Sequence, residues 1–194
     1  MKIYGDIQSG NCYRTKLLIS LLNNSHDYQW IPMDILAKDT HKPEFLKINP
    51  NGKIPALALE NGCVLTESNA ILNYLAHGTI FLPENKFIRA KILQWQFFEQ
   101  YIAVARFINK YLGLPENKKE EYASKQKGGY KALAIMEQQL NTTPFLVNDT
   151  PSIAHFSLYA YTHVEEGGFD LSLYQNIQQW LLRTSNLPRY IGID

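Results

Sequence analysis

The sequence has 194 residues, of which 45% are hydrophobic and 19% charged, and its formal net charge is +1. These values are ordinary for a globular protein that buries its own core. Because the charge is near neutral, nucleic acid is not expected as a partner. The sequence contains no stretch of about 18 apolar residues, so no membrane span is predicted.

The first 77 residues alternate strand-like and helix-like segments. Short apolar runs predict strands at residues 2–6, 28–32, 54–59 and 63–65. Asn61-Gly62 favours a hairpin between the last two strands. Helical spacing of apolar residues predicts helices over residues 12–22, 43–48 and 67–75. The order βαβαββα predicts a small mixed sheet, because one crossover helix makes a parallel pair and the hairpin adds an antiparallel pair.

Beyond Gly78 the pattern changes to helices alone. Residues 78–86 contain glycine, proline and asparagine, as linkers do. Helices are expected over residues 87–112, 118–140, 152–164 and 173–184, and the third is apolar nearly all round, which predicts burial. The sequence therefore predicts an α+β protein with a mixed-sheet domain over residues 1–77, a linker over 78–86 and an all-helical domain over 87–194.

The segment Asn49-Pro50-Asn51-Gly52-Lys53-Ile54-Pro55-Ala56-Leu57 is the most specific motif. An X-Pro bond at the entrance of a strand is a natural place for a cis peptide. A cis Pro55 would turn the backbone N–H and C=O of Ile54 outward, where an extended peptide could pair with them. The alternative is an ordinary trans proline on an edge strand.

Thr66-Glu67-Ser68 opens the third predicted helix. The first N–H groups of a helix have no intrahelical partner, and the helix dipole favours negative charge there. A ligand carboxylate could accept hydrogen bonds from Ser68, while the Glu67 carboxylate takes a ligand ammonium. These two residues thus suit the head group of an α-amino acid, although the same residues could serve only as a helix cap.

Ser9-Gly10-Asn11-Cys12 lies between the first strand and the first helix. Ser9 could donate its hydroxyl hydrogen to a thiolate at the helix N-terminus, with Asn11 as a second contact to the sulfur. Alternatively, Ser9 only caps the helix. Cys12 falls one helical turn later, so we expect it to face the core.

Together these segments resemble the glutathione transferase family, in particular bacterial, theta-like members with a serine at the catalytic position. The resemblance covers nearly the whole chain and includes Pro144-Phe145-Leu146-Val147 and Trp180-Leu181-Leu182-Arg183. It implies a thioredoxin-like glutathione-binding domain followed by a helical-bundle domain. It also implies a cytoplasmic, detoxifying homodimer that uses glutathione as co-substrate, without a metal, to attack a small apolar electrophile.

The resemblance assigns roles to particular residues. Ile54 and Pro55 would meet the cysteinyl unit of glutathione, Glu67 and Ser68 its γ-glutamyl group, and Lys53 and His41 its glycine carboxylate. Ser9 and Asn11 would be the catalytic residues. Aromatic residues of the first long helix are candidate walls of the electrophile pocket, or else core residues: Phe97, Tyr101 and Phe107.

Two other functions remain open. A glutathione-dependent thiol reductase or peroxidase could use Cys12 or Cys63, although these cysteines form no CxxC pair and cannot build a metal site alone. A non-catalytic scaffold could keep the glutathione pocket without turnover. One departure from the family is His155, which stands where an aspartate usually completes a capping box with Ser152, so His155→Asp is expected to raise the melting temperature.

Overall fold

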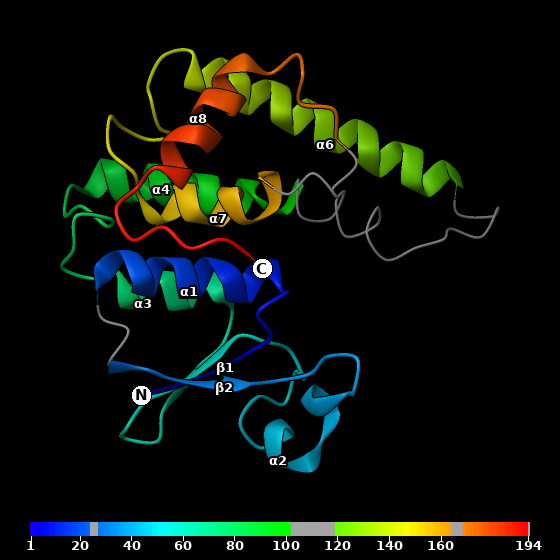
Figure 1. The fold of residues 1–194 in the computed structure, drawn as a ribbon, viewed down its shortest axis with the longest axis vertical. Coiled ribbons are helices and arrows are strands. Elements are labelled where there is room, and N and C mark those ends of the chain that lie inside the picture. Colours follow the sequence, from blue (N-terminus) through cyan, green and yellow to red (C-terminus); the bar gives the residue numbers. More distant parts are fainter. Residues whose placement is uncertain (24–26, 102–118, 164–168, 194) are drawn as a thin grey trace. The chain divides into compact units, whose positions relative to one another are not determined.

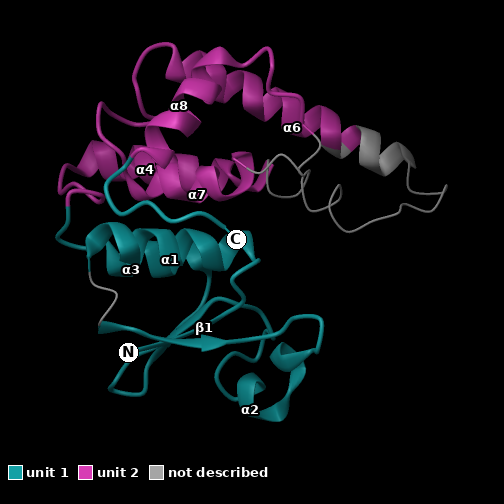
Figure 2. Ribbon diagram, viewed as in Figure 1, with its two compact units in different colours: residues 1–79, 187–194 teal, residues 80–186 magenta. Residues whose placement is uncertain are grey.

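A computed structural model describes residues 1–23, 27–101, 119–163 and 169–193 (Figure 1). The chain divides into two compact units, residues 1–79 with 187–194 and residues 80–186 (Figure 2). Among the described residues, none of the helices combines the length and apolarity that a membrane crossing needs. Each unit is described below by itself.

The first unit is built on a four-stranded mixed sheet, as predicted. Its strands are β1 (Lys2–Gly5), β2 (Gln29–Pro32), β3 (Ala56–Ala58) and β4 (Val64–Leu65), in the order β2-β1-β3-β4. β1 runs parallel to β2 and antiparallel to β3, and β3 runs antiparallel to β4. Leu65, the last residue of β4, pairs with Leu57 of β3, and the chain continues from there to the next helix.

Helices cover the sheet of the first unit. α1 (Gly10–Leu22) and α3 (Ser68–Leu75) pack together on one side, and α2 (Pro43–Leu46) lies on the other, preceded by a short 3₁₀ turn at Asp39–His41 (Figure 1). The apolar residues that predicted these helices are buried, with Leu17, Leu18 and Ile71 fully inaccessible. The N-termini of α1 and α3 lie close to one another on the same side of the sheet.

The end of the chain belongs to the first unit. Tyr13 Oη donates a hydrogen bond to the Ile191 carbonyl over 2.8 Å, and Ser20 Oγ donates to the Arg189 carbonyl over 2.8 Å. Both donors lie on α1, so the last residues run along that helix (Figure 1). Periodicity alone had grouped this tail with the helical domain.

The second unit is helical, as predicted. It contains α4 (Lys86–Phe98), α6 (Lys119–Leu140), α7 (Ile153–Thr162) and α8 (Gln175–Ser185). α4 packs on α7 and α6 packs on α8. Nearly every residue of α7 is buried, which confirms the expectation of a central helix. The Glu137 carboxylate of α6 accepts hydrogen bonds of 2.9 Å from the backbone N–H groups of Asn176 and Ile177, so one helix caps the next.

His155 does not complete a capping box with Ser152, whose side chain makes no cap hydrogen bond. The fully buried imidazole instead accepts from Trp180 Nε1 at Nδ1 over 2.5 Å, and its Nε2 lies 2.9 Å from Thr184 Oγ1. Because the Thr184 hydroxyl donates to the Trp180 carbonyl, Nε2 carries the imidazole proton and donates it to Thr184. The residue that looked like a lost cap thus joins α7 to α8.

Candidate glutathione site

The N-terminus of α1 carries the first set of site residues. Ser9 is the N-cap residue, and its side chain makes no cap hydrogen bond to the helix backbone. It hydrogen-bonds instead to the Cys12 thiol, whose pKa this bond lowers. The interpretation of Ser9 as a side-chain cap is therefore wrong, and its hydroxyl is turned toward sulfur.

Cys12 is fully buried, as the helical spacing predicted. Burial raises the pKa of its thiol to about 11, because desolvation outweighs the opposing effects of Ser9 and Arg14. The thiol is therefore protonated at neutral pH, and it is also inaccessible. Cys63, in the turn between β3 and β4, is exposed. Cys12 therefore does not resemble the low-pKa, accessible cysteine that thiol chemistry requires.

Asn11 links the N-terminal turns of α1 and α3. Its Oδ1 accepts a hydrogen bond of 3.2 Å from Ser68 Oγ and one of 2.5 Å from Arg14 Nη2. Arg14 Nη1 donates in turn to Asn69 Oδ1 over 2.9 Å. The structure thus brings together two predicted residues, Asn11 and Ser68, that are 57 positions apart in the chain.

Arg14 and Asn69 were not predicted as site residues. One signal was present in the sequence, since Arg14 lies four residues before Leu18 and therefore on the apolar face of α1. Burying a charged residue costs free energy unless the residue is paired, so a charge at a core position predicts hydrogen-bond partners. The identity of those partners depended on how α1 and α3 pack, which the sequence did not reveal.

The peptide bond between Ile54 and Pro55 is cis, which decides between the cis and trans alternatives that the motif left open. Asn49 holds the preceding turn, because its Nδ2 donates to the Lys53 carbonyl over 2.6 Å and its Oδ1 accepts from the Asn51 N–H over 3.1 Å. The backbone N–H and C=O of Ile54 make no hydrogen bond within the part of the chain that the structure describes. An extended ligand can therefore pair with them.

Glu67 and Ser68 lie at the beginning of α3, where they were predicted. Ser68 is buried and Glu67 is exposed. Glu67 has a φ of 65° and a ψ of 113°. A positive φ at a residue other than glycine costs about 1–3 kcal/mol, and such strain persists where the surrounding structure enforces it, often at ligand sites.

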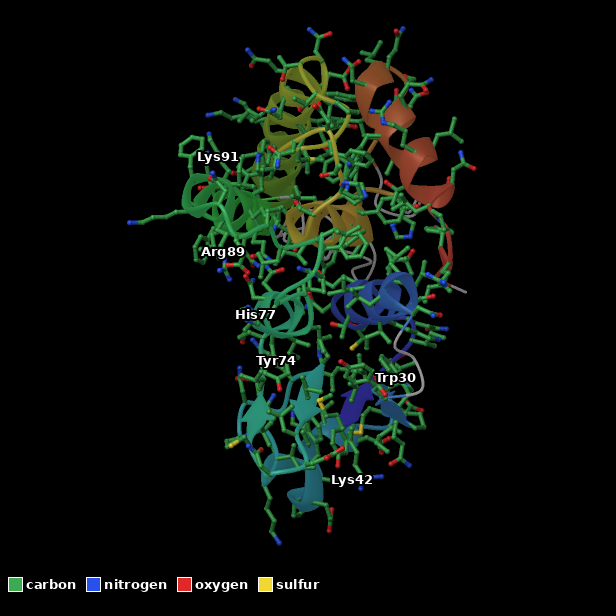
Figure 3. The ribbon with its side chains drawn as sticks, turned by 90° about the vertical axis from the view of Figure 1, so that its left-hand side faces the viewer. Trp30, Lys42, Tyr74, His77, Arg89 and Lys91 are labelled. Atoms are coloured by element: carbon green, nitrogen blue, oxygen red, sulfur yellow. The ribbon has the colours of Figure 1, made fainter. Side chains whose placement is uncertain are left out.

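Lys53 and His41 lie at the surface of the first unit. Both are exposed, and His41 Nδ1 lies 3.1 Å from Thr40 Oγ1. Lys42, labelled in Figure 3, forms an ion pair of 2.6 Å with Asp39 and closes the loop before α2. Among the described residues, no hydrogen bond joins Lys53 or His41 to Asn11 or Ser68, and the assignment of Lys53 and His41 to a glycine carboxylate stays a prediction.

The proposed electrophile residues lie in the second unit or outside the described residues. Phe97 and Tyr101 are 76% and 64% exposed, so they are not core residues of the unit. Phe107 lies outside the described residues. α4 and α6 enclose a groove of about 500 Å³, but its apolar lining consists of Trp95, Phe98 and Ile135. Lys91, which also lines this groove, is labelled in Figure 3.

Family models agree with this organisation. The model described as "Glutathione S-transferase, N-terminal domain" matches residues 1–77, and the model for the C-terminal domain of the same family matches residues 89–188. A solved structure of a glutathione S-transferase from Pseudomonas fluorescens is 56% identical, with a TM-score of 0.92, and the alignment covers 99% of this chain and 98% of that one.

Two curated relatives that carry other names are more distant. Disulfide-bond oxidoreductase YfcG of Escherichia coli is 28% identical over 89% of this chain and 86% of that protein. Elongation factor 1-gamma-B of Xenopus laevis is 29% identical over 78% of this chain, but the match spans only 36% of the relative. With both domain models matched in order, this chain belongs to the glutathione S-transferase family.

Proposed function

We propose that this chain is a glutathione transferase that binds glutathione at the N-termini of α1 and α3 and activates its thiol as a thiolate. The observation that carries the proposal is the hydrogen bond between Asn11 and Ser68. It holds the two residues expected to meet the thiol and the γ-glutamyl carboxylate within one small cluster. Family membership and the 56% identical transferase support the same function.

Recognition of the peptide follows from groups at two places in the first unit, the N-terminus of α3 and the backbone of Ile54. The γ-glutamyl carboxylate accepts from Ser68 and the first N–H groups of α3, and Glu67 takes the ammonium. The cysteinyl backbone pairs with the two unpaired backbone groups of Ile54. A solved structure from Burkholderia graminis with the same fold holds two glutathione molecules per subunit, which agrees with a glutathione ligand.

Activation of the thiol needs only a moderate energy. A free thiol with a pKa near 8.5 is about 3% ionised at neutral pH, and lowering its pKa by about two units costs about 2.7 kcal/mol. One hydrogen bond to a charged group supplies about 1.5–3 kcal/mol. The α1 N-terminus adds about 0.3–1 kcal/mol. Ser9 or Asn11 together with α1 therefore accounts for the activation without a general base.

The experiment that tests the proposal joins binding with turnover. Glutathione is titrated into the purified protein by calorimetry, and conjugation of a chlorodinitrobenzene-type electrophile is then followed at slightly acidic pH. Saturable binding with turnover above the uncatalysed rate supports the transferase. Binding without turnover would point to a reductase, a peroxidase or a scaffold, and absence of binding would remove the proposal.

Disulfide exchange is the second candidate reaction, and the relationship to YfcG favours it. In this reaction the glutathione thiolate attacks one sulfur of a disulfide, forms a mixed disulfide with it and releases the other sulfur as a thiolate. A second glutathione thiolate then attacks the glutathione sulfur of the mixed disulfide, which yields oxidised glutathione and releases the remaining substrate sulfur as a thiolate. This route needs no cysteine of the protein, which agrees with the burial of Cys12. Assays with hydroxyethyl disulfide and with the electrophile, compared on one enzyme preparation, rank the two reactions.

A further inference from the structure

Arg14 is a buried cation at the centre of the candidate site. Arg14 is only 1% exposed, although it lies in the first turns of α1. Its two terminal nitrogens donate to amide oxygens of two different helices, Asn11 on α1 and Asn69 on α3. A planar guanidinium with donors on both arms fixes the relative orientation of the two acceptors.

The contact with Arg14 decides which end of the Asn11 amide faces the ligand. Amide oxygen and nitrogen are ordinarily hard to distinguish, and the hydrogen-bond network assigns them. Arginine can only donate, so the Asn11 atom that faces Arg14 must be the oxygen. Ser68 Oγ approaches the same oxygen. The amide nitrogen, with its two N–H donors, is therefore left for a ligand.

We infer that Arg14 is a positioning residue of the glutathione site, which orients Asn11 so that its amide N–H groups, rather than its oxygen, meet the glutathione sulfur. This inference rests on the proposed function. An amide that presents only donors stabilises a thiolate, which accepts hydrogen bonds, over a neutral thiol. Arg14 thereby acts on the thiol through Asn11 and touches no reacting atom.

The charge of Arg14 works in the same direction. Its positive charge lowers the pKa of the Cys12 thiol, the thiol of this chain nearest to the same helix end. A glutathione thiol at the N-terminus of α1 experiences the same sign of field. Orientation and charge can be separated, because Arg14→Lys keeps the charge and loses the planar fork that holds both amides.

The test measures the pKa of the bound glutathione thiol from the ultraviolet absorbance of the thiolate during a pH titration. The proteins compared are the wild type, Asn11→Ala, Arg14→Met and the double variant. Lys16→Met is the matched control, because it removes the same charge from the same helix at a residue whose ammonium lies 5.8 Å from the Trp30 ring. Turnover and the glutathione dissociation constant are measured in parallel.

We expect Asn11→Ala and Arg14→Met each to raise the pKa of the bound thiol by about one unit and to lower turnover about tenfold, as loss of one charge-assisted hydrogen bond implies. The double variant should change the pKa by clearly less than the sum of the two single changes, because both remove the same donor and only the charge of Arg14 is lost in addition. Lys16→Met should match the wild type. Arg14→Lys should recover part of the pKa shift through its charge.

Three results would overturn the inference. The first is an Arg14→Met protein whose bound thiol titrates as in Lys16→Met. The second is full additivity in the double variant, which would mean that Arg14 does not act through Asn11. The third result concerns Arg14→Lys, which replaces Arg14→Met in the cycle if Arg14→Met does not fold. An unchanged thiol pKa in Arg14→Lys would then overturn the inference. A wild-type protein that binds no glutathione would instead remove the proposed function itself.

Discussion

Ser68 Oγ donates a hydrogen bond to Asn11 Oδ1 over 3.2 Å, and this contact joins the N-terminal turns of α1 and α3. In the proposed complex Ser68 meets the γ-glutamyl carboxylate of the ligand, and Asn11 meets the thiol of the cysteinyl unit. A glutathione carboxylate would compete with Asn11 for the Ser68 proton. In that complex, binding of the γ-glutamyl carboxylate would change the hydrogen bonding of the residue that meets the thiol.

Ser68→Ala should weaken glutathione binding about tenfold or more, because a hydrogen bond to a carboxylate contributes about 1.5–3 kcal/mol. Calorimetric titration measures the dissociation constant. Ser20→Ala is the control, since it makes the same chemical change at a serine whose hydroxyl donates only to the Arg189 carbonyl. Equal affinity in the two variants would exclude Ser68 from the carboxylate site.

Ser9→Ala should lower turnover about tenfold or more while glutathione still binds, because the hydroxyl would stabilise the thiolate and not the peptide as a whole. Initial rates at saturating glutathione give this comparison. In the free protein Ser9 hydrogen-bonds to the Cys12 thiol, and a glutathione thiolate would be the better acceptor. Wild-type turnover in Ser9→Ala would leave Asn11 as the sole candidate donor.

Cysteine labelling should distinguish the two thiols. Cys12 is fully buried with its pKa raised to about 11, whereas Cys63 is exposed. We expect an alkylating reagent at neutral pH to modify one cysteine of the folded protein and both after denaturation, as counted by mass spectrometry. Cys63→Ser should then show no rapid labelling in the folded state. Fast modification of Cys12 would contradict its burial and would revive a reductase mechanism that uses it.

His155 should make the folded protein sensitive to acid. Burial, and to a lesser degree the charge of Arg183, lower the pKa of this imidazole from 6.5 to about 3. Between these values the unfolded chain binds a proton that the folded chain does not. Stability is therefore complete above about pH 6.5 and falls as the pH drops toward 3, by about 1.4 kcal/mol per pH unit.

Denaturant unfolding at several pH values measures this slope. The comparison is with His155→Gln, which retains an acceptor and a donor but does not titrate, so the difference between the two slopes isolates the imidazole. Parallel slopes would contradict the prediction. His155→Asp should now lower the melting temperature, contrary to the expectation from the capping box, because it removes the buried partner of Trp180 and Thr184 at a cost of about 1–3 kcal/mol.

Local patterns predicted the main parts of the fold and of the site. Short apolar runs predicted the strands of the mixed sheet, and the apolar character of residues 152–164 predicted the buried α7. Pro55 at a strand entrance indicated the place of the cis peptide, and the spacing of α1 predicted a buried Cys12. These features depend on a few neighbouring residues, so a single sequence carries enough information to find them.

Features that depend on packing between distant segments were not predicted. Arg14 finds Asn69, 55 positions away, only because α1 and α3 lie side by side. His155 reaches Trp180, 25 positions away, in place of the nearby Ser152. The last residues pack along α1 through backbone carbonyls, which any sequence can offer. In each case the residue type was visible, but its partner was set by tertiary structure.

The most direct test of the central claim is the pKa of the glutathione thiol when it is bound to the wild-type protein. Stabilisation of the thiolate at the N-terminus of α1 predicts a value about two units below that of free glutathione, with conjugating activity that rises over the same pH range. Bound glutathione whose thiol titrates as it does in water would contradict the account, because the site would then hold the peptide without activating it.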